Sequence, residues 1–328
     1  MILDRLCVSC SFGVLLAGFA VGQQQPKRDF GLMPDLPPIL KKAVESAPKI
    51  RYSGLRTVEF REGPDREKYS ETVIKDGSRS RSEIGTGSKN AGQIIVEDGE
   101  QRLHFFPDLN EIHVLPLQRE EALSRLMRFL RPGPRKLELS VEDGVKVAGI
   151  ETKSVSVKDK DGNVITRLWI DPESGMILKR ELYDPVGAVV GGFEFTRINF
   201  RPNIREDDFK IDRRGAKRLT LSDILQKLCE QNDYLVVKIP TGEPYVLENV
   251  RMLTHGPQPV LAQFYRSKIG PISLFQVKCT VDEKIMQRMA RPNTSTATWS
   301  IKGRSFALVG EVGKAELDRL AAKIKLQQ

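Results

Sequence analysis

Residues 167–200, RLWIDPESGMILKRELYDPVGAVVGGFEFTRINF, decide the fold of this chain. They form three apolar-rich runs separated by two turns of similar composition, Asp171–Gly175 and Asp184–Gly187. In each turn proline suits the second position, and glycine supplies the positive φ that closes the turn. The runs carry the β-branched and aromatic residues that favour strands. The stretch therefore predicts three consecutive antiparallel strands.

The same pattern extends towards the N-terminus, where short alternating runs are separated by Asp-Gly pairs typical of hairpin turns. Together these runs predict a meander of about eleven strands. Because a twisted sheet of this size rarely stays open, we expect it to curl into a half-barrel. The candidate strands lie near residues 50–61, 67–75, 78–84, 92–97, 101–106, 111–115, 136–141, 145–157, 163–170, 176–183 and 189–200.

Two amphipathic helices accompany the predicted sheet. Pro38 begins the first, which ends before Pro48, and the second covers 119–130, with apolar residues at helical spacing and Pro132 as a stop. A helix inserted into a curled meander is expected to place its apolar stripe on the concave face. The predicted fold class is therefore α+β: a curved antiparallel half-barrel sheet with helices plugging its concave face.

A sheet plugged by helices can open for an apolar guest, so its core residues are also candidates for lining a cavity. Alternation puts Phe193 and Phe195 on one face of their strand and Ile198 on the other. Ordinary core packing is the alternative interpretation. The candidates for a hydrophobic-ligand cavity are Tyr52, Phe60, Phe105, Leu123, Met127, Leu130, Trp169, Phe193 and Phe195.

The chain carries a formal net charge of +9, and basic residues cluster in the middle helix and in the linker after the last strand of the meander. Such clusters attract anionic lipid headgroups or an acidic partner. A solvated helix face and a charged linker are the simpler alternative. Nucleic acid is not favoured, because no aromatic residues are interleaved with these charges. The candidate contacts for a partner or for peripheral membrane binding are Arg125, Arg128, Arg131, Arg135, Arg213 and Arg214.

The sequence holds no nucleophile elbow, zinc-protease or phosphate-loop motif, and most aspartates lie in turns. We therefore predict no enzyme activity, no cofactor and no metal centre; a hydrolase with an unrecognised site is the weakest alternative. His104 and His113 are expected to face each other across a hairpin, near Glu111. Zinc binding or acid sensing by this pair is a hypothesis, weakened by the incomplete set of metal ligands.

Residues 1–22 combine Arg5, an apolar core and small residues before Gln23, which predicts a signal peptide and export to the periplasm. A retained membrane anchor is the alternative. Residues 23–38, rich in glutamine and proline, are expected to form a flexible tail.

The charged residues 201–218 predict a boundary between a domain of residues 39–212 and a smaller α+β domain of residues 219–328. Cys229 and Cys279 remain after export, and the sequence leaves open whether they form a disulfide or stay separate buried thiols. The smaller domain is expected to begin and end with a helix, with strands near 234–239, 245–253, 259–266, 272–281, 296–302 and 304–310.

The segments IRYSGLRTVEFR (50–61), RLHFFPDLNEIHVLP (102–116) and 168–200 resemble the MucB/RseB family, whose N-terminal domain shares the LolA/LolB lipoprotein-carrier fold. GRSFALVGEVGKAELDRLA (303–321) is similar to the second domain of that family. The resemblance implies an eleven-stranded half-barrel and a non-catalytic protein that binds an acyl chain, a lipoprotein or a membrane-anchored anti-sigma factor.

Two functional hypotheses follow. The first is an exported regulator of the envelope-stress type, which senses lipid or lipoprotein in a hydrophobic cavity and acts on a membrane partner. The alternative is a periplasmic carrier that moves lipoproteins or acyl lipids between membranes.

Overall fold

The computed structural model describes residues 36–62, 65–117, 138–253, 258–278 and 294–325. The predicted signal peptide, most of the predicted tail and the helix predicted at 119–130 lie outside these ranges. The described residues form two compact units. One lies within Asp29–Ile112 and Pro116–Lys217, and the other comprises His113–Leu115 with the described part of Arg218–Gln328. The described residues form two sheets.

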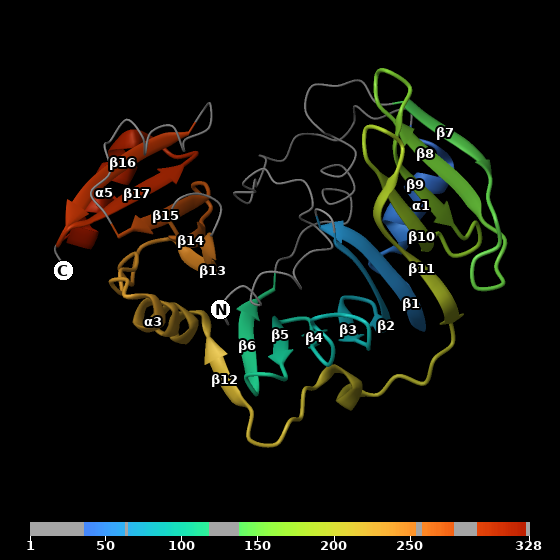
Figure 1. Cartoon of the computed structure of the whole chain (residues 1–328), viewed down its shortest axis with the longest axis horizontal. Coiled ribbons are helices and arrows are strands. Elements are labelled where there is room, and N and C mark those ends of the chain that lie inside the picture. The colour runs from blue at the N-terminus through green and yellow to red at the C-terminus, as the bar shows by residue number, and fades with distance from the viewer. Residues whose placement is uncertain (1–35, 63–64, 118–137, 254–257, 279–293, 326–328) are drawn as a thin grey trace. The chain divides into compact units, whose positions relative to one another are not determined.

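The larger sheet contains twelve strands within the described ranges, in the spatial order β12-β6-β5-β4-β3-β2-β1-β11-β10-β9-β8-β7. Figure 1 shows these strands following an arc, which confirms the predicted curved half-barrel sheet. The strands are β1 (Arg51–Glu62), β2 (Asp65–Asp76), β3 (Arg79–Ile84), β4 (Ile94–Glu97), β5 (Gln101–Phe106), β6 (Glu111–Pro116), β7 (Glu138–Asp143), β8 (Lys153–Lys158), β9 (Val164–Ile170), β10 (Ile177–Tyr183), β11 (Val189–Asn199) and β12 (Lys217–Thr220).

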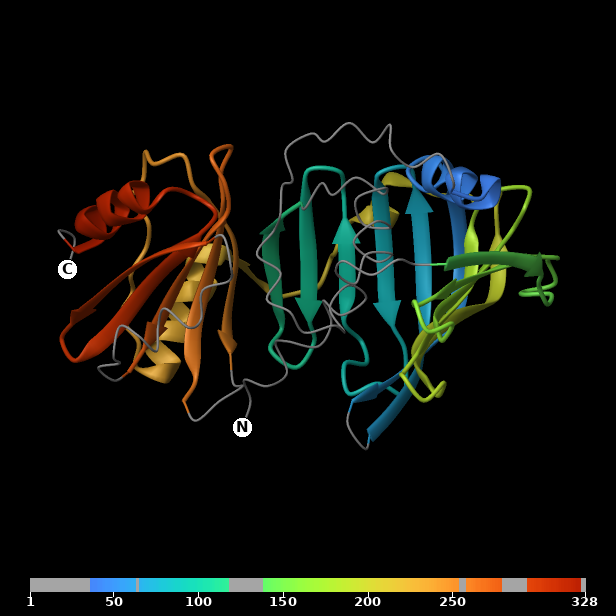
Figure 2. The same cartoon turned by 90° about the horizontal axis from the view of Figure 1, so that it is seen from above.

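The first Asp-Pro turn fixes the N-terminal helix α1 (Pro38–Ser46) to the sheet (Figure 2). Lys42 Nζ donates a hydrogen bond to the carbonyl oxygen of Pro172 over 2.7 Å. Gly175 has a φ of +76°, and a Cβ at this position would lie 2.9 Å from the carbonyl oxygen of Lys42. Leu40 of α1 is fully buried in a cluster with residues of β8 and β9. The first Asp-Pro turn, which the sequence predicts, is therefore also the turn against which α1 packs.

Two predictions about the larger sheet were wrong. The strand expected at 145–157 begins only at Lys153, because Ala148 and Gly149 adopt positive φ angles and turn the chain back on itself. An isolated bridge between Val147 and Ile150 closes that turn. The predicted linker also contributes a twelfth strand, β12, in which Lys217 N donates to the carbonyl of Asn110.

The smaller sheet has the order β13-β14-β15-β17-β16. Helix α5 packs Leu317 and Leu320 into a core with Phe306 and Leu308, and helix α3 packs Leu225 and its neighbours into a second cluster. Figure 2 shows both helices with this sheet. The elements are β13 (Val246–Leu253), β14 (Val260–Arg266), β15 (Ile272–Val277), β16 (Ser295–Ile301), β17 (Arg304–Gly310), α3 (Leu221–Asn232) and α5 (Lys314–Lys325).

The strand predicted at 234–239 is absent, because side chains of the sheet satisfy its backbone instead of a neighbouring strand. Gln263 Nε2 donates to the carbonyl of Val237 over 2.8 Å, and Ile239 N donates to the hydroxyl of Tyr265 over 3.3 Å. These bonds tie an extended segment to the sheet without adding a strand. No helix within the described ranges is both long enough and apolar enough to span a membrane.

Candidate functional site

The strand register gathers four of the predicted cavity residues on one face of the larger sheet. Val58 pairs with Phe193 and Arg56 with Phe195, so these side chains share a face with Tyr52 and Phe60 two to four residues away on β1. Phe195 and Tyr52 are buried, with 1% and 8% exposure. Their rings meet edge to face, with centroids 5.8 Å apart. We call this surface the aromatic face.

The other predicted cavity residues are placed differently. Trp169 belongs to the same buried cluster, but its side chain starts from the opposite face of the sheet. It is the register partner of Lys179 on β10, and Lys179 is the register partner and ion-pair partner of Glu194 on β11. Glu194 points to the face opposite its neighbour Phe193. Phe105 also projects to the opposite face, since the register runs from it through Ile94 to Thr72 of β2. Leu123, Met127 and Leu130 lie outside the described residues.

The prediction for Ile198 was wrong, and a β-bulge is the reason. The register of β1 with β11 shifts between Leu55 and Arg56, so that Gly54 pairs with Ile198 and Arg56 with Phe195. Gly54 and Arg56 share a face because β1 is regular there. Ile198 therefore joins Phe195 on the aromatic face and packs against the same cluster.

Charged groups are built into the aromatic face. Arg56 donates to Glu71 from Nε and from Nη2, each over 2.7 Å, and both side chains are largely buried. Burial raises the pKa of Tyr52 and lowers the pKa of Arg180, the register partner of Phe193, to about 10. The aromatic face is thus mainly apolar but contains charged side chains that are partly removed from water. Burying such charges costs free energy, and buried charges of this kind are common at binding sites.

On the opposite face, residues 201–216 run along the sheet from the end of β11 to β12 (Figure 1). We call this segment the strap; it contains the short 3-10 helix η2 (Glu206–Phe209). Arg81 of β3 donates to the carbonyls of Asp208 and Lys210 over 3.3 and 2.8 Å. Phe209 is buried beneath the guanidinium of Arg79, whose carbon lies 4.6 Å from the ring centre.

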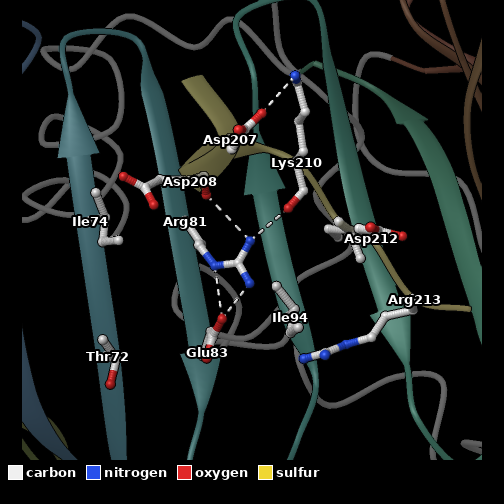
Figure 3. Close-up of a pocket in the computed structure, with 11 residues that line it drawn as sticks. Thr72, Ile74, Arg81, Glu83, Ile94, Asp207, Asp208, Lys210, Asp212 and Arg213 are labelled. Carbon is white, nitrogen blue, oxygen red and sulfur yellow. Dashed lines mark hydrogen bonds and ion pairs between the residues drawn. The ribbon is translucent and has the colours of Figure 1, made fainter. Parts of the chain in front are cut away.

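Between the strap and strands β2 to β4 lies a pocket of about 400 Å³, which we call the strap pocket. Figure 3 shows Arg81 lying between Ile74 and Ile94, with further charged side chains around them. Arg81 binds Glu83 through Nε over 2.8 Å, and Lys210 binds Asp207 over 2.8 Å. The lining residues are Thr72, Ile74, Arg81, Glu83, Ile94, Asp207, Asp208, Lys210, Ile211, Asp212 and Arg213.

Asp207 and Lys210 of the strap change each other's pKa. The ammonium group of Lys210 lowers the pKa of Asp207, and Asp207 in turn raises the pKa of Lys210. Both side chains are exposed, so this pair contributes little to stability. Arg213, one of the predicted partner contacts, lines the strap pocket, and its guanidinium carbon lies 5.6 Å from the centre of the Phe105 ring. Arg214 is exposed and does not line the pocket.

The two histidines of the predicted hairpin are both buried. His104 Nε2 lies 2.9 Å from Gln93 Oε1, and its ring packs on Phe106 with centroids 4.0 Å apart. Glu111 is buried as well. Within the part of the chain that the structure describes, no group of three or more metal-ligating side chains occurs.

The remaining predicted sites are only partly placed. Cys229 is buried with a free thiol, whose sulfur lies 3.4 Å from the carbonyl oxygen of Leu235. Burial raises the pKa of this thiol to about 11. Cys279 lies outside the described residues, so the disulfide and the two separate thiols both stay hypotheses. The basic candidates Arg125, Arg128, Arg131 and Arg135 also fall outside.

Sequence reasoning missed the strap pocket. Part of its sheet wall comes from Arg81 and Glu83 of β3, which point to the same face as Arg79. That alternation of charge is visible in the sequence and indicates a polar face. The second wall is the strap, which the sequence shows only as a charged linker.

A model of the MucB/RseB N-terminal domain matches residues 40–212, more than half of the chain. No curated protein matches the chain. The crystal structure of MucB has 16% sequence identity and a TM-score of 0.39, with 87% of this chain and 95% of that chain covered. For the complex of Pseudomonas aeruginosa MucA and MucB the values are 15%, 0.40, 86% and 95%. For the LolA superfamily protein NE2245 from Nitrosomonas europaea they are 15%, 0.28, 53% and 96%.

Proposed function

The chain belongs to the MucB/RseB family, and from this premise we propose that it is an exported, non-enzymatic regulator of a membrane-anchored anti-sigma factor. In this proposal the aromatic face holds the apolar chain of a lipid or lipoprotein, and its occupancy changes the affinity for the partner. The family match across residues 40–212 is the observation that carries the proposal. Residues 1–22 would direct the chain to the periplasm.

The composition of the aromatic face supports an apolar ligand. Phe60 and Phe193 are only half-buried, beside the buried Tyr52 and Phe195. Aromatic side chains offer large contact areas, and each methylene of an acyl chain removed from water contributes about 0.8 kcal/mol. A chain of about ten methylenes in contact with this face would therefore bind with useful affinity even after the cost of ordering it.

The second unit favours regulation over simple carriage. It has a core of its own, in which α5 covers one face of a five-stranded sheet. A carrier needs one compartment for its cargo, whereas a regulator needs a second surface that reports whether the compartment is full. The two units of this chain fit the second requirement.

Native mass spectrometry of the purified mature protein tests whether an apolar chain is bound. We expect a co-purifying acyl lipid, or uptake of added palmitate, in the wild type. Phe193→Ala should weaken palmitate binding about tenfold, and Phe264→Ala, a half-buried phenylalanine of β14 in the other unit, is the matched control. An empty protein that also refuses palmitate would overturn the ligand proposal.

A pull-down with the periplasmic segment of a membrane-anchored anti-sigma factor from the same genome tests the partner proposal. Retention of that segment by the mature full chain is the expected result. Transfer of acyl lipid to acceptor vesicles, with no retention of the segment, would instead identify a carrier.

A further inference from the structure

One face of the smaller sheet carries an apolar surface that lies away from α3 and α5. Ala262 pairs with Phe275, and Phe275 pairs with Ala307, so these side chains share a face of β14, β15 and β17. Helices α3 and α5 pack against the opposite face, where Leu261 and Leu308 belong to their clusters. We call the first surface the alanine face. Its buried residues are Val260, Ala262, Phe275, Val277, Ala307 and Val309.

The alanine face is buried although no helix within the described ranges adds a residue to its cluster. Ala262 and Ala307 are 0% exposed, and Phe275 is 5% exposed. A sheet buries an apolar face by packing it against a second layer of structure. Small residues beside a large one leave room for the side chains of such a layer. The alanine face therefore requires an occupant.

The order of the strands points to an occupant from the same chain. Strands β15 and β16 both pair antiparallel with β17, which lies between them, so β15 and β16 are parallel to each other. Two parallel strands need a crossover of a dozen residues or more, usually a helix. The connection from Val277 to Ser295 is long enough for this purpose. It therefore returns over one face of the sheet.

The hand of the crossover selects the alanine face. Glu311, which alternates with Val309, donates from its backbone N to the carbonyl of Pro271 over 3.4 Å. Residues of β17 on the alanine face thus direct their backbone groups towards β15. For L-residues, a view of this face with β15 and β16 running upwards then has β15 on the left and β16 on the right. A right-handed crossover, the hand of about 98% of such connections, passes in front of the sheet in this view.

The sequence of the connection suits an apolar surface. Residues 279–293 lie outside the described ranges, but their sequence predicts an amphipathic helix. Thr280 and Glu283 match a capping box, and Pro292 is a stop signal. Residues 281–290 would span about 15 Å as a helix, close to the length of a short strand. Three apolar residues recur on one side of that helix: Val281, Ile285 and Met289.

We propose that the alanine face docks residues 281–290 of this chain as an amphipathic helix, with Ile285 and Met289 against Ala262 and Ala307. This inference is independent of the proposed regulatory function. With α3 and α5 on the opposite face, the helix would leave neither face of the smaller sheet open. A partner protein would then meet this unit at its helices, loops or strand edges.

Methyl NMR of the full mature chain, labelled at alanine, isoleucine and methionine, tests the position of the segment. We expect nuclear Overhauser effects from the methyl groups of Ile285 and Met289 to those of Ala262 and Ala307. We expect none to Ile272, which lies in the core on the α5 side. Effects to Ile272 instead, or no effects to Ala262 and Ala307 in the folded wild type, would overturn the inference.

A pair of variants tests the contribution of the segment to the sheet. Ile285→Asp should increase hydrogen exchange of the amides of β15 and β17 about tenfold, because a carboxylate would enter the apolar contact. Gln287→Asp, on the opposite side of the predicted helix, should leave exchange unchanged. Equal exchange in both variants would contradict the proposed contact, and the wild-type spectrum decides the question if Ile285→Asp does not fold. Contacts that appear only between labelled and unlabelled molecules would identify a second copy as the occupant and overturn the proposal.

Discussion

The guanidinium carbon of Arg56 lies 4.9 Å from the centre of the Phe193 ring, in the middle of the aromatic face. The same guanidinium is paired with Glu71. A charge placed on an aromatic ring in apolar surroundings is stabilised by a carboxylate that pairs with it, and removal of that carboxylate is destabilising. The aromatic face is therefore an apolar surface with a fixed polar centre.

Removal of Glu71 should expose the dependence of Arg56 on its partner. We expect Glu71→Ala to lower the free energy of unfolding by about 3 kcal/mol, because a buried charge loses its counter-ion. The double variant Arg56→Met with Glu71→Ala should recover a large part of that loss. Urea unfolding measures both, and a loss below about 0.5 kcal/mol for Glu71→Ala would show that water replaces the carboxylate.

Gly175 should tolerate no side chain, because α1 lies against it. Gly175→Ala combines an unfavourable positive φ with a Cβ 2.9 Å from the carbonyl oxygen of Lys42. Gly187→Ala is the matched control, since Gly187 has a similar φ of +83° and nothing within 4 Å of the added Cβ. We expect Gly175→Ala to be more destabilising by at least about 1 kcal/mol in thermal or urea unfolding. Equal losses of stability in the two variants would contradict the packing of α1 against this turn.

Those two turns also show which features of the fold can be predicted from the sequence. Both Asp-Pro turns form with glycine at positive φ, as predicted, and the strands around them follow from alternation and turn chemistry. The turn at Ala148 and Gly149 was missed because alanine carries no turn signal. The bulge beside Phe195 and the side-chain bonds of Gln263 depend on neighbours that are distant in sequence, and so does the strap pocket.

Acid should weaken the attachment of α5 to its unit. Arg319 donates to both carboxylate oxygens of Glu243 over 2.9 and 2.7 Å, and Lys323 also binds this carboxylate. These bonds lower the pKa of Glu243 from 4.5 to about 2. Since the folded pKa is below the ordinary value, the stabilisation is present above about pH 4.5 and is lost as the pH falls towards 2.

Glu243→Gln should accordingly be less stable than the wild type at pH 7, and the difference should disappear near pH 2. Thermal unfolding followed between pH 7 and pH 2 measures the difference. A difference that stays constant over this range would show that the carboxylate charge has no part in the attachment.

The strap should depend on Arg81 more than on Arg79. Arg81 holds two strap carbonyls, whereas the strap carboxylate that Arg79 binds, Glu206, is 77% exposed. We expect Arg81→Met to increase hydrogen exchange and tryptic cleavage within residues 205–214 several-fold, with a smaller effect from Arg79→Met. Equal protection in both variants and in the wild type would mean that Phe209 and Ile211 alone hold the strap.

The most direct test of the proposed regulation is the affinity of the full mature chain for the periplasmic segment of its anti-sigma partner, measured by calorimetry with and without saturating palmitoyl lysophospholipid. We predict a change in Kd of about tenfold or more, a coupling of about 1.4 kcal/mol, which Phe193→Ala abolishes and Phe264→Ala retains. An unchanged Kd in the wild type, or no binding of the segment under either condition, would contradict the account.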